Sequence, residues 1–456
     1  MIFCLEGSKT PRFILGESKL ALRIGYQQSI RREFAHPLKP QIPGIFLKLH
    51  TATYDLKYYF PEKNGWEGAL GINGMYQTNN SDAGTNFVIP SYKIFDVAPF
   101  VYAKKNIGKI DLASGARFDV RSFENEKLYF KKNPENGFDK VTNDTSGATQ
   151  RFNKYKHTFE GFSASFGLTF NITEQFLIKA NVARGYRAPN ISEISARGVH
   201  PGTGYQQLGD ENLKPENNLQ EDFGIFFDSK HVSMSAEVFY NLIDNYIFNQ
   251  KLKGMGGGDS LFPESGNYYP VFKFIQTKAQ LYGGEAKIDI HPHPLDWLHI
   301  ENSISFVYSQ NLGGKEIIVN DSNKFLPLIP PLHTNSEIIA EFRKTILCFA
   351  NVFIKAGVQY YAPQNRALLM NNTETKTAEY VLIDAGIGAD IKIKKTKTLF
   401  TLGIYCTNIA DVAYQSNMSR LKYFDNFPKN YTGRSGIYGM GRNVSFKLTI
   451  PFGIKN

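Results

Sequence analysis

The sequence predicts an all-β protein: an antiparallel up-and-down transmembrane β-barrel, of which about sixteen strands are present. Three observations predict this fold class. Apolar and polar residues alternate along most of the chain, the alternating segments are long, and the connections between them are long and short in turn. The composition agrees, because the 456 residues include 36 Phe, 25 Tyr and 39 Gly, which favour strands and turns. No apolar run reaches the roughly 18 residues of a membrane-spanning helix, so a protein that crosses the membrane with helices is excluded.

Alternation with a period of two residues indicates strands with one apolar and one polar face. It is clearest in segments 110–120, 162–170, 232–242, 298–308, 381–391 and 444–452. Most such segments have roughly 10–16 residues, against about 5–6 in soluble proteins, and a tilted strand of that length crosses a bilayer core. In a barrel the apolar face contacts lipid and the polar face a wet interior. We therefore expect Ile110, Phe166, Ile288 and Phe446 to face outward, and Asp111, Ser165, Lys287 and Lys447 to face inward.

The connections distinguish a barrel from a two-sheet sandwich, which would also alternate. The long connections are 29–43, 79–91, 123–156, 187–217, 243–275, 311–333, 361–376 and 411–439. The short ones, which fall between them, are 60–65, 105–108, 172–174, 228–231, 291–296, 343–345 and 392–397. In a meander every second connection lies at the same end, so one end carries the tight turns and the other the long loops. That asymmetry is typical of an outer-membrane barrel. We expect Asn456 at the short-turn end.

Charge and cysteine content point to no cofactor, metal or nucleic-acid partner. The net charge is +10, from 52 Lys and Arg against 42 Asp and Glu, but the lysines are spread along the chain except at 392–397. Cys4, Cys348 and Cys406 are distant from one another and form no metal-binding or disulfide pattern. The run 291–294, His-Pro-His-Pro, has no third ligand nearby in sequence, so we interpret it as a turn.

We expect two regions in the chain. Residues 1–18 are predicted to be an irregular N-terminal segment without an export signal, and residues 19–456 to be a partial outer-membrane β-barrel domain.

Five sequence blocks carry a family resemblance. Residues 183–193 are ARGYRAPNISE, 209–216 are GDENLKPE, 281–286 are LYGGEA, 407–414 are TNIADVAY, and 441–443 are GRN. In this order they resemble the barrel of TonB-dependent outer-membrane receptors, over roughly residues 159–456. Ile409 and Ala410 depart from the commoner Leu-Phe of the fourth block. The residues that match the family pattern are Gly185, Tyr186, Arg187, Ala188, Pro189, Asn190, Glu193, Asn212, Leu213, Lys214, Pro215, Glu216, Asn408, Asp411, Arg442 and Asn443.

The resemblance implies a Gram-negative outer-membrane receptor that takes up a scarce nutrient: a siderophore, cobalamin, a glycan or a peptide. Such receptors have a globular plug and a barrel of about 22 strands. The chain is therefore expected to be the C-terminal portion, with the plug, the first strands and the signal peptide missing. The implied partners are outer-membrane lipid, the barrel assembly machinery through the C-terminal strand, and the TonB complex only if a plug is supplied. We expect either a gapped, C-shaped sheet or a closed barrel in which 19–28 pairs weakly with 443–452.

Aromatic residues in the long loops are the candidates for ligand contact: Tyr205, Tyr268, Tyr269, Tyr423, Phe424 and Tyr431. No Ser/His/acid set with a local catalytic signature is present, so we do not predict an enzyme. The alternative function is a non-energised barrel, either porin-like or adhesin-like.

Overall fold

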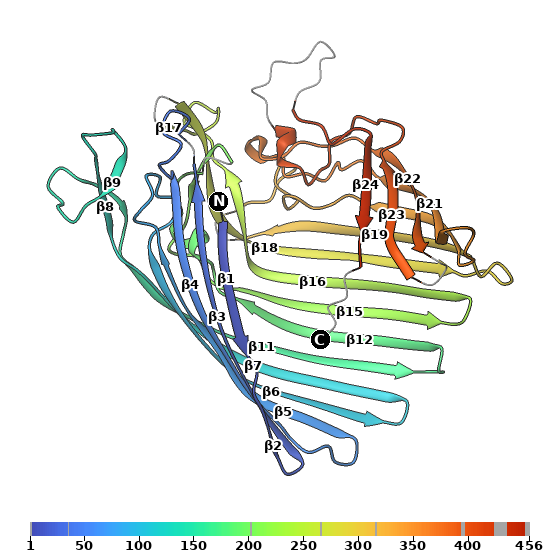
Figure 1. Cartoon of the computed structure of the whole chain (residues 1–456). Coiled ribbons are helices and arrows are strands. Elements are labelled where there is room, and N and C mark those ends of the chain that lie inside the picture. The colour runs from blue at the N-terminus through green and yellow to red at the C-terminus, as the bar shows by residue number, and fades with distance from the viewer. Residues whose placement is uncertain are drawn as a thin grey trace.

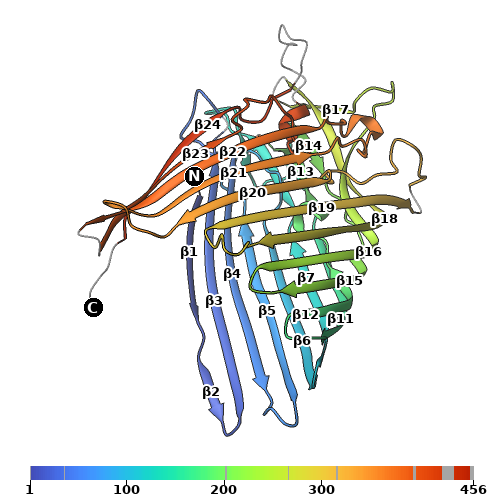
Figure 2. The same ribbon diagram turned by 90° about the vertical axis from the view of Figure 1, so that its right-hand side faces the viewer.

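The structure is a computed structural model that describes residues 2–34, 36–200, 203–264, 267–314, 317–393, 397–423 and 436–451. These residues form one sheet of 21 strands, antiparallel except for the pairing of β14 with β18, and a separate three-stranded sheet, β10-β8-β9, in one loop. Figures 1 and 2 show the large sheet as a twisted, strongly curved wall that leaves one side open. The prediction of an all-β antiparallel barrel fold is confirmed.

The wall consists of long strands in chain order. They are β1 (Ile2–Lys9), β2 (Arg12–Leu15), β3 (Ser18–Glu33), β4 (Ile45–Tyr59), β5 (Trp66–Asn80), β6 (Tyr92–Ile107), β7 (Ile110–Asn125), β11 (Tyr155–Asn171), β12 (Phe176–Arg187), β15 (Glu216–Asp228), β16 (Val232–Lys251), β18 (Asn267–Ile290), β19 (Leu298–Gly313), β20 (His333–Phe342), β21 (Phe349–Tyr361), β22 (Tyr380–Ile393), β23 (Lys397–Thr407) and β24 (Asn443–Thr449). The loops contain β8 (Leu128–Lys132), β9 (Asp139–Val141), β10 (Thr149–Phe152), α1 (Ile191–Ser195), β13 (Arg197–His200), β14 (Tyr205–Leu208), β17 (Leu261–Glu264), η1 (Met370–Asn372) and η2 (Arg420–Tyr423).

From β3 onward, each wall strand pairs antiparallel with the next one along the chain. The other side of β3 pairs with β1 and β2, so these two strands form one edge of the sheet and β24 forms the other. Among the described residues no pairing joins the two edges. Of the two expected outcomes, the gapped, C-shaped sheet is therefore the one observed. In the described part of the chain, 19–28 does not pair with 443–451, because β1 and β2 occupy that side of β3.

The expected irregular segment at 1–18 is wrong for most of its length. Cys4 in β1 pairs with Ser29, and Phe13 in β2 pairs with Leu20. The segment lacks clear alternation, since residues 2–5 are all apolar, so its periodicity gave no strand signal. Its backbone groups are instead satisfied by the free edge of β3, and that requirement makes it a strand.

The predicted sorting of connections is confirmed. All long connections join strands at one end of the sheet, which we call the loop end, and all short connections lie at the opposite, short-turn end. At the short-turn end Thr449, the last residue of β24, pairs with Thr401, near the start of β23. Asn456 itself lies outside the described residues.

The predicted faces are also confirmed. Phe166 and Phe446 are 52% and 73% exposed, whereas Ser165 lines a hollow that marks the concave face. Directly paired residues share a face, so the ladders extend the assignment to the other positions. These pairs are Ile110 with Phe170, Asp111 with Thr169, Ile288 with Met234, Lys287 with Ser303, Phe446 with Ile404, and Lys447 with Gly403.

Buried apolar clusters lie at the loop end, where loops cover strand ends. Examples are the clusters of Phe159, Ala188 and Ile194, and of Ala279, Leu326 and Ile329. The rest of the wall exposes its large apolar side chains on one face. In the described residues we find no helix with the length and apolarity needed to cross a membrane.

Candidate functional site

The first family block builds the turn that leaves β12. Asn190 is the N-cap of α1: its side chain accepts from the Glu193 backbone N–H at 3.0 Å, and the Glu193 carboxylate accepts from the Asn190 N–H at 2.8 Å. This reciprocal capping box satisfies two donors that a helix start leaves free. Pro189 before the cap is fully buried, and Ala188 packs against Phe159 and Ile194. This turn is therefore determined by residues that are close in sequence.

Arg187 ties that turn to the next strand. Its guanidinium donates to both Glu193 carboxylate oxygens, at 3.0 and 2.9 Å, and its Nε donates to Glu216 at the start of β15. The other Glu216 oxygen accepts from the Ile247 backbone N–H in β16 at 2.6 Å. The Glu193 and Glu216 side chains are only 9% and 14% exposed, so their charges depend on this cation.

The second block fastens the same loop to β18. Lys214 exchanges two backbone hydrogen bonds with the Gln276 side chain, at 2.9 and 2.7 Å. Asp210 accepts from the Asn212 backbone N–H at 2.9 Å and pairs with Lys273 at 2.8 Å. Leu213 between them is buried. Pro215 accepts through its carbonyl from the Asn245 side chain at 3.0 Å.

The last two blocks hold the base of the connection between β23 and β24. The Asn408 side chain accepts from the Val412 N–H at 2.9 Å and donates to the Val412 and Met440 carbonyls at 3.0 and 3.2 Å. The Asp411 carboxylate accepts from the Arg442 N–H at 2.7 Å, and Arg442 Nε donates to the Ile409 carbonyl at 2.8 Å. Asn408 and Asp411 both have φ near +50°, a conformation in which Asn and Asp are favoured.

The remaining family-pattern residues sit at the ends of strands near these contacts. The ring of Tyr186 packs against the cluster of Phe159 and Ala188 and lies over Gly161, where a Cβ would collide with it. Gly185 lines the concave hollow, with Asn218 so close that a side chain would not fit there. Asn443 donates to the Met440 sulfur at 2.9 Å. The family pattern therefore marks residues that anchor loops.

The loop aromatics are brought together in part. Tyr205 in β14 packs against Phe272 in β18, with ring centroids 4.5 Å apart, and its hydroxyl is 3.0 Å from Arg420 Nη1, which donates to it. Because β14 runs parallel to β18, Tyr205 also lies beside the strand that carries Tyr269. Tyr268, the next residue back, is 72% exposed. Tyr423 ends η2, and Phe424 and Tyr431 lie outside the described residues.

Sequence reasoning missed a buried polar network that joins three loops. The Ile329 carbonyl accepts from both the Gln364 and Asn417 side chains at 2.8 Å. Glu374 accepts from two backbone N–H groups, those of Leu328 at 2.7 Å and Leu368 at 3.0 Å. Such residues have no periodic spacing, so only the folded loops reveal them.

Lys422 in η2 belongs to the same network. Its Nζ donates to the carbonyl and side-chain oxygens of Asn417 at 2.8 and 2.9 Å, and burial lowers the pKa of this lysine. The network and the Tyr205–Arg420 contact together fix the last long connection over the others.

Below the loops, the concave face holds an open hollow of about 520 Å³, lined by both polar and apolar residues. Arg117 on its wall pairs with Asp119 at 2.7 Å and donates to Asn73 at 2.7 Å. Lys57 and Gln220 also line it. A barrel wall with a polar interior and loops fixed over one mouth defines the class of outer-membrane barrel proteins.

Comparison with known proteins identifies the family. The family model described as TonB dependent receptor-like, beta-barrel, matches residues 100–409, and the chain belongs to this family. It is 22% identical over 270 residues to the probable TonB-dependent siderophore receptor PirA of Acinetobacter baumannii, covering 56% of this chain and 33% of that protein. It is 19% identical over 223 residues to the iron-regulated outer membrane virulence protein of Vibrio cholerae, covering 48% of this chain and 31% of that protein.

Solved structures share the fold. The copper transporter OprC aligns with a TM-score of 0.72 at 13% identity, over 99% of this chain and 67% of OprC. The ferric yersiniabactin uptake receptor FyuA of Yersinia pestis aligns with a TM-score of 0.61 at 12% identity, over 99% of this chain and 61% of FyuA. The matched region spans about a third of each curated relative and about two thirds of these structures.

Proposed function

We propose that this chain is the barrel portion of an energised receptor that takes up a ferric chelate of the siderophore class across the Gram-negative outer membrane. The observation that carries the proposal is the family match over residues 100–409. The hydrogen bonds and ion pairs that anchor the loops to the sheet support it. One relative is named as a siderophore receptor and another as a ferric yersiniabactin uptake receptor, which favours this substrate class over cobalamin, glycan or peptide. The family model and the similar structures are named as receptors and transporters. This favours a transport receptor over an enzyme and over a porin-like or adhesin-like barrel.

The loop end has chemistry suited to such a ligand. Siderophore complexes are compact, often anionic and frequently aromatic, so they are bound by stacking and by cationic donors. Tyr205 and Arg420 offer a ring and a guanidinium in contact with each other, and exposed Tyr268 lies on the neighbouring hairpin of β17 and β18. Tyr269, Tyr423, Phe424 and Tyr431 complete the proposed set.

The partners follow from the same proposal. The β24 edge is the strand that the barrel assembly machinery would engage, and the hollow around Arg117 is where a plug would dock. The TonB complex acts only through such a plug. The open side between β1 and β24 is where further strands would complete the barrel, because an unpaired edge in lipid costs several kcal/mol for each unsatisfied group.

An uptake assay tests the proposal. The chain is expressed behind an export signal in a Gram-negative strain that lacks its own siderophore receptors, alone and together with a separately encoded plug and first strands from a family member. Uptake of radiolabelled ferric siderophores is measured with and without the proton-motive force. We expect energy-dependent uptake only with the complement. Energy-independent uptake of unrelated small solutes by both would instead support a passive pore and contradict the proposal.

Site variants distinguish ligand contact from loop packing. Tyr205→Phe and Arg420→Gln remove the hydroxyl and the charge, and Tyr268→Ala removes an exposed ring. We expect weaker chelate binding in outer-membrane vesicles for each, with unchanged heat resistance of the barrel. Tyr59→Ala, at the short-turn end of β4, is the matched control and should bind as the parent does. Equal binding by all variants would contradict the assignment of the loop aromatics.

A further inference from the structure

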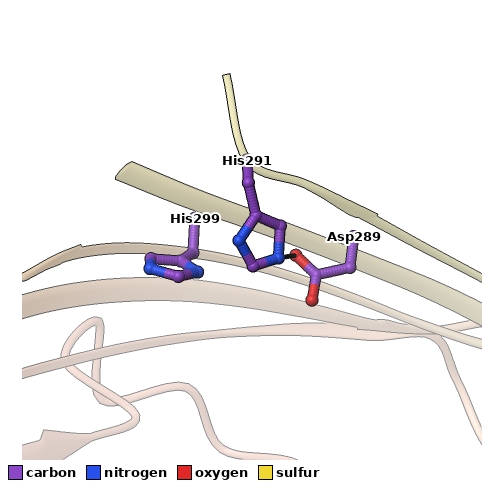
Figure 3. A group of neighbouring side chains, drawn as sticks. All are labelled: Asp289, His291 and His299. Atoms are coloured by element: carbon purple, nitrogen blue, oxygen red, sulfur yellow. Dashed lines mark ion pairs between the residues drawn. The ribbon is translucent and has the colours of Figure 1, made fainter. Parts of the chain in front are cut away.

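A second cluster of ligand-type side chains lies at the short-turn end, away from the loops. It consists of Asp289 near the end of β18, His291 just after it, and His299 at the start of β19 (Figure 3). The prediction that 291–294 forms a turn is confirmed, since the chain reverses there between β18 and β19. From the sequence we expected no third metal ligand close to the His-Pro-His-Pro run. The turn itself supplies one, because it folds His299 back beside His291.

The strand register explains why the three side chains meet. Asp289 pairs with Glu301 and Ile290 pairs with Ile300, so His291 and His299 occupy the next position of the same ladder. Alternate residues share a face, so Asp289 and His291 point the same way. The rings of His291 and His299 lie edge to face, with centroids 4.4 Å apart. On the other side, the His291 N–H donates to the His231 carbonyl at 2.8 Å, which prolongs the pairing of β16 with β18.

The geometry is close to that of a three-ligand metal site. One ligand atom from each residue lies within 4.8 Å of the other two, and His291 Nε2 is 3.0 Å from Asp289 Oδ1. Ligands bound to zinc at about 2.0–2.2 Å stand about 3.3 Å apart in a tetrahedron, so small side-chain rotations suffice. All three residues are half-buried strand or turn residues, which limits the entropy lost on binding.

Two polar side-chain atoms of this cluster have no hydrogen-bond partner in the described structure. Asp289 Oδ1 and His299 Nε2 are both shielded from solvent and accept or donate no hydrogen bond. The short contact between His291 and Asp289 is therefore poorly aligned as a hydrogen bond, despite its length. Lys287, two residues before Asp289 in β18, contacts Glu301 at 3.3 Å instead. A cation would give the Asp289 carboxylate and the His299 imidazole a shared partner, which a plain His291–Asp289 ion pair does not.

We propose that Asp289, His291 and His299 bind one divalent transition-metal ion, of the zinc class, at the short-turn mouth of the barrel. Two imidazoles and one carboxylate match the ligands that such ions prefer, and three protein ligands leave one position for water or an incoming ligand. The ion joins β18 to β19 across their turn. This site is separate from the loop end and does not depend on the proposed uptake function.

Metal titration of the purified full chain in detergent tests the site. After removal of metal by a chelator, Co²⁺ is added and its visible absorption recorded, and Zn²⁺ is then titrated in by calorimetry. We expect one ion per chain, a Co²⁺ spectrum of low coordination number, and displacement by Zn²⁺. A chain that binds neither ion after chelation would overturn the proposal.

Variants identify the ligands. His299→Ala and Asp289→Asn should each weaken Zn²⁺ binding at least about tenfold, the scale on which metal sites respond to lost partners. His293→Ala is the matched control, because His293 lies in the same turn but faces Asp296 at 3.4 Å. It should bind as the parent does. Equal weakening by His293→Ala and His299→Ala would indicate diffuse binding to surface histidines and contradict the site. Circular dichroism of each variant confirms that the sheet is retained, and the Co²⁺ spectrum of the parent tests the site even if one variant misfolds.

Discussion

Arg187 and Glu193 form an ion pair in which one guanidinium nitrogen, Nη1, lies 3.0 and 2.9 Å from the two carboxylate oxygens. They are six residues apart, at the end of β12 and in α1, and the same guanidinium also reaches Glu216. Two largely buried carboxylates thereby share one cation, which fixes both ends of the connection between β12 and β15. The loop that carries Tyr205 starts from a rigid base.

Arg187→Met should destabilise the sheet strongly. Removing the cation leaves the Glu193 and Glu216 carboxylates buried without a partner, a change that costs about 3–5 kcal/mol. The measurement is the free energy of unfolding by urea in detergent. Adding Glu193→Gln and Glu216→Gln to this variant should recover part of the loss, because Gln keeps the capping hydrogen bond without the charge. An unchanged urea midpoint for the single variant would show that the ion pair is not what holds this loop.

A lysine on the apolar face should be costly only in the middle of the wall. Phe162 lies near the centre of β11 and is exposed on that face, so Phe162→Lys should destabilise the protein in lipid by about 2–4 kcal/mol. Ser163→Lys is the neighbouring control, since Ser163 lines the concave hollow, and it should cost little. Ile288→Lys, two residues from the end of β18, should cost only about 0–1 kcal/mol, as expected near the interface. Equal costs for Phe162→Lys and Ser163→Lys would contradict the faces.

Disulfide cross-linking should report the open side of the sheet. In a Cys348→Ser, Cys406→Ser background, Ser29→Cys places a thiol directly opposite Cys4, and the two should form a disulfide on mild oxidation. Phe446→Cys, on the far edge strand β24, should not cross-link to Cys4, because the two edges are unpaired in the described residues. Electrophoresis without reductant separates the two products. Efficient cross-linking of Cys4 to the thiol introduced by Phe446→Cys, within one chain, would show that the barrel closes.

Acid should loosen the contact between the first long loop and the loop of β8 to β10. His36 stacks on Phe138, with centroids 4.1 Å apart, and its Nε2 lies 3.0 Å from the Thr85 hydroxyl. Burial lowers the pKa of His36 in the folded protein below its ordinary value of 6.5. The unfolded loop therefore binds the proton more readily, and stability is lost as the pH falls from 6.5 through the folded pKa.

Amide hydrogen exchange of residues 126–154 measures this effect. Exchange should accelerate between about pH 7 and pH 5, after correction for the intrinsic rate. His36→Gln, which cannot be protonated, should remove the acceleration. If the variant shows the same acid response as the parent, another group controls this loop.

Much of the fold follows from local sequence. The alternation in 162–170 assigned the faces of Phe166 and Ser165 correctly, because side chains of a strand point to opposite sides whatever the strand pairs with. Connection lengths sorted the loops, and the blocks at 183–193 and 209–216 placed the chain in its family. Strand β1 was missed, because its apolar run carries no period of two and only the free edge of β3 makes it a strand.

The residues that meet across the sheet were decided by tertiary structure alone. Arg420 reaches Tyr205 across 215 positions of sequence, and no local pattern encodes that contact. His299 joins His291 and Asp289 because of the register between β18 and β19, which a shift of one residue would destroy. Side-chain direction along a strand is set by covalent geometry and can be predicted from the sequence. Register and loop contacts depend on many strands satisfying their hydrogen bonds together, so only the folded sheet determines them.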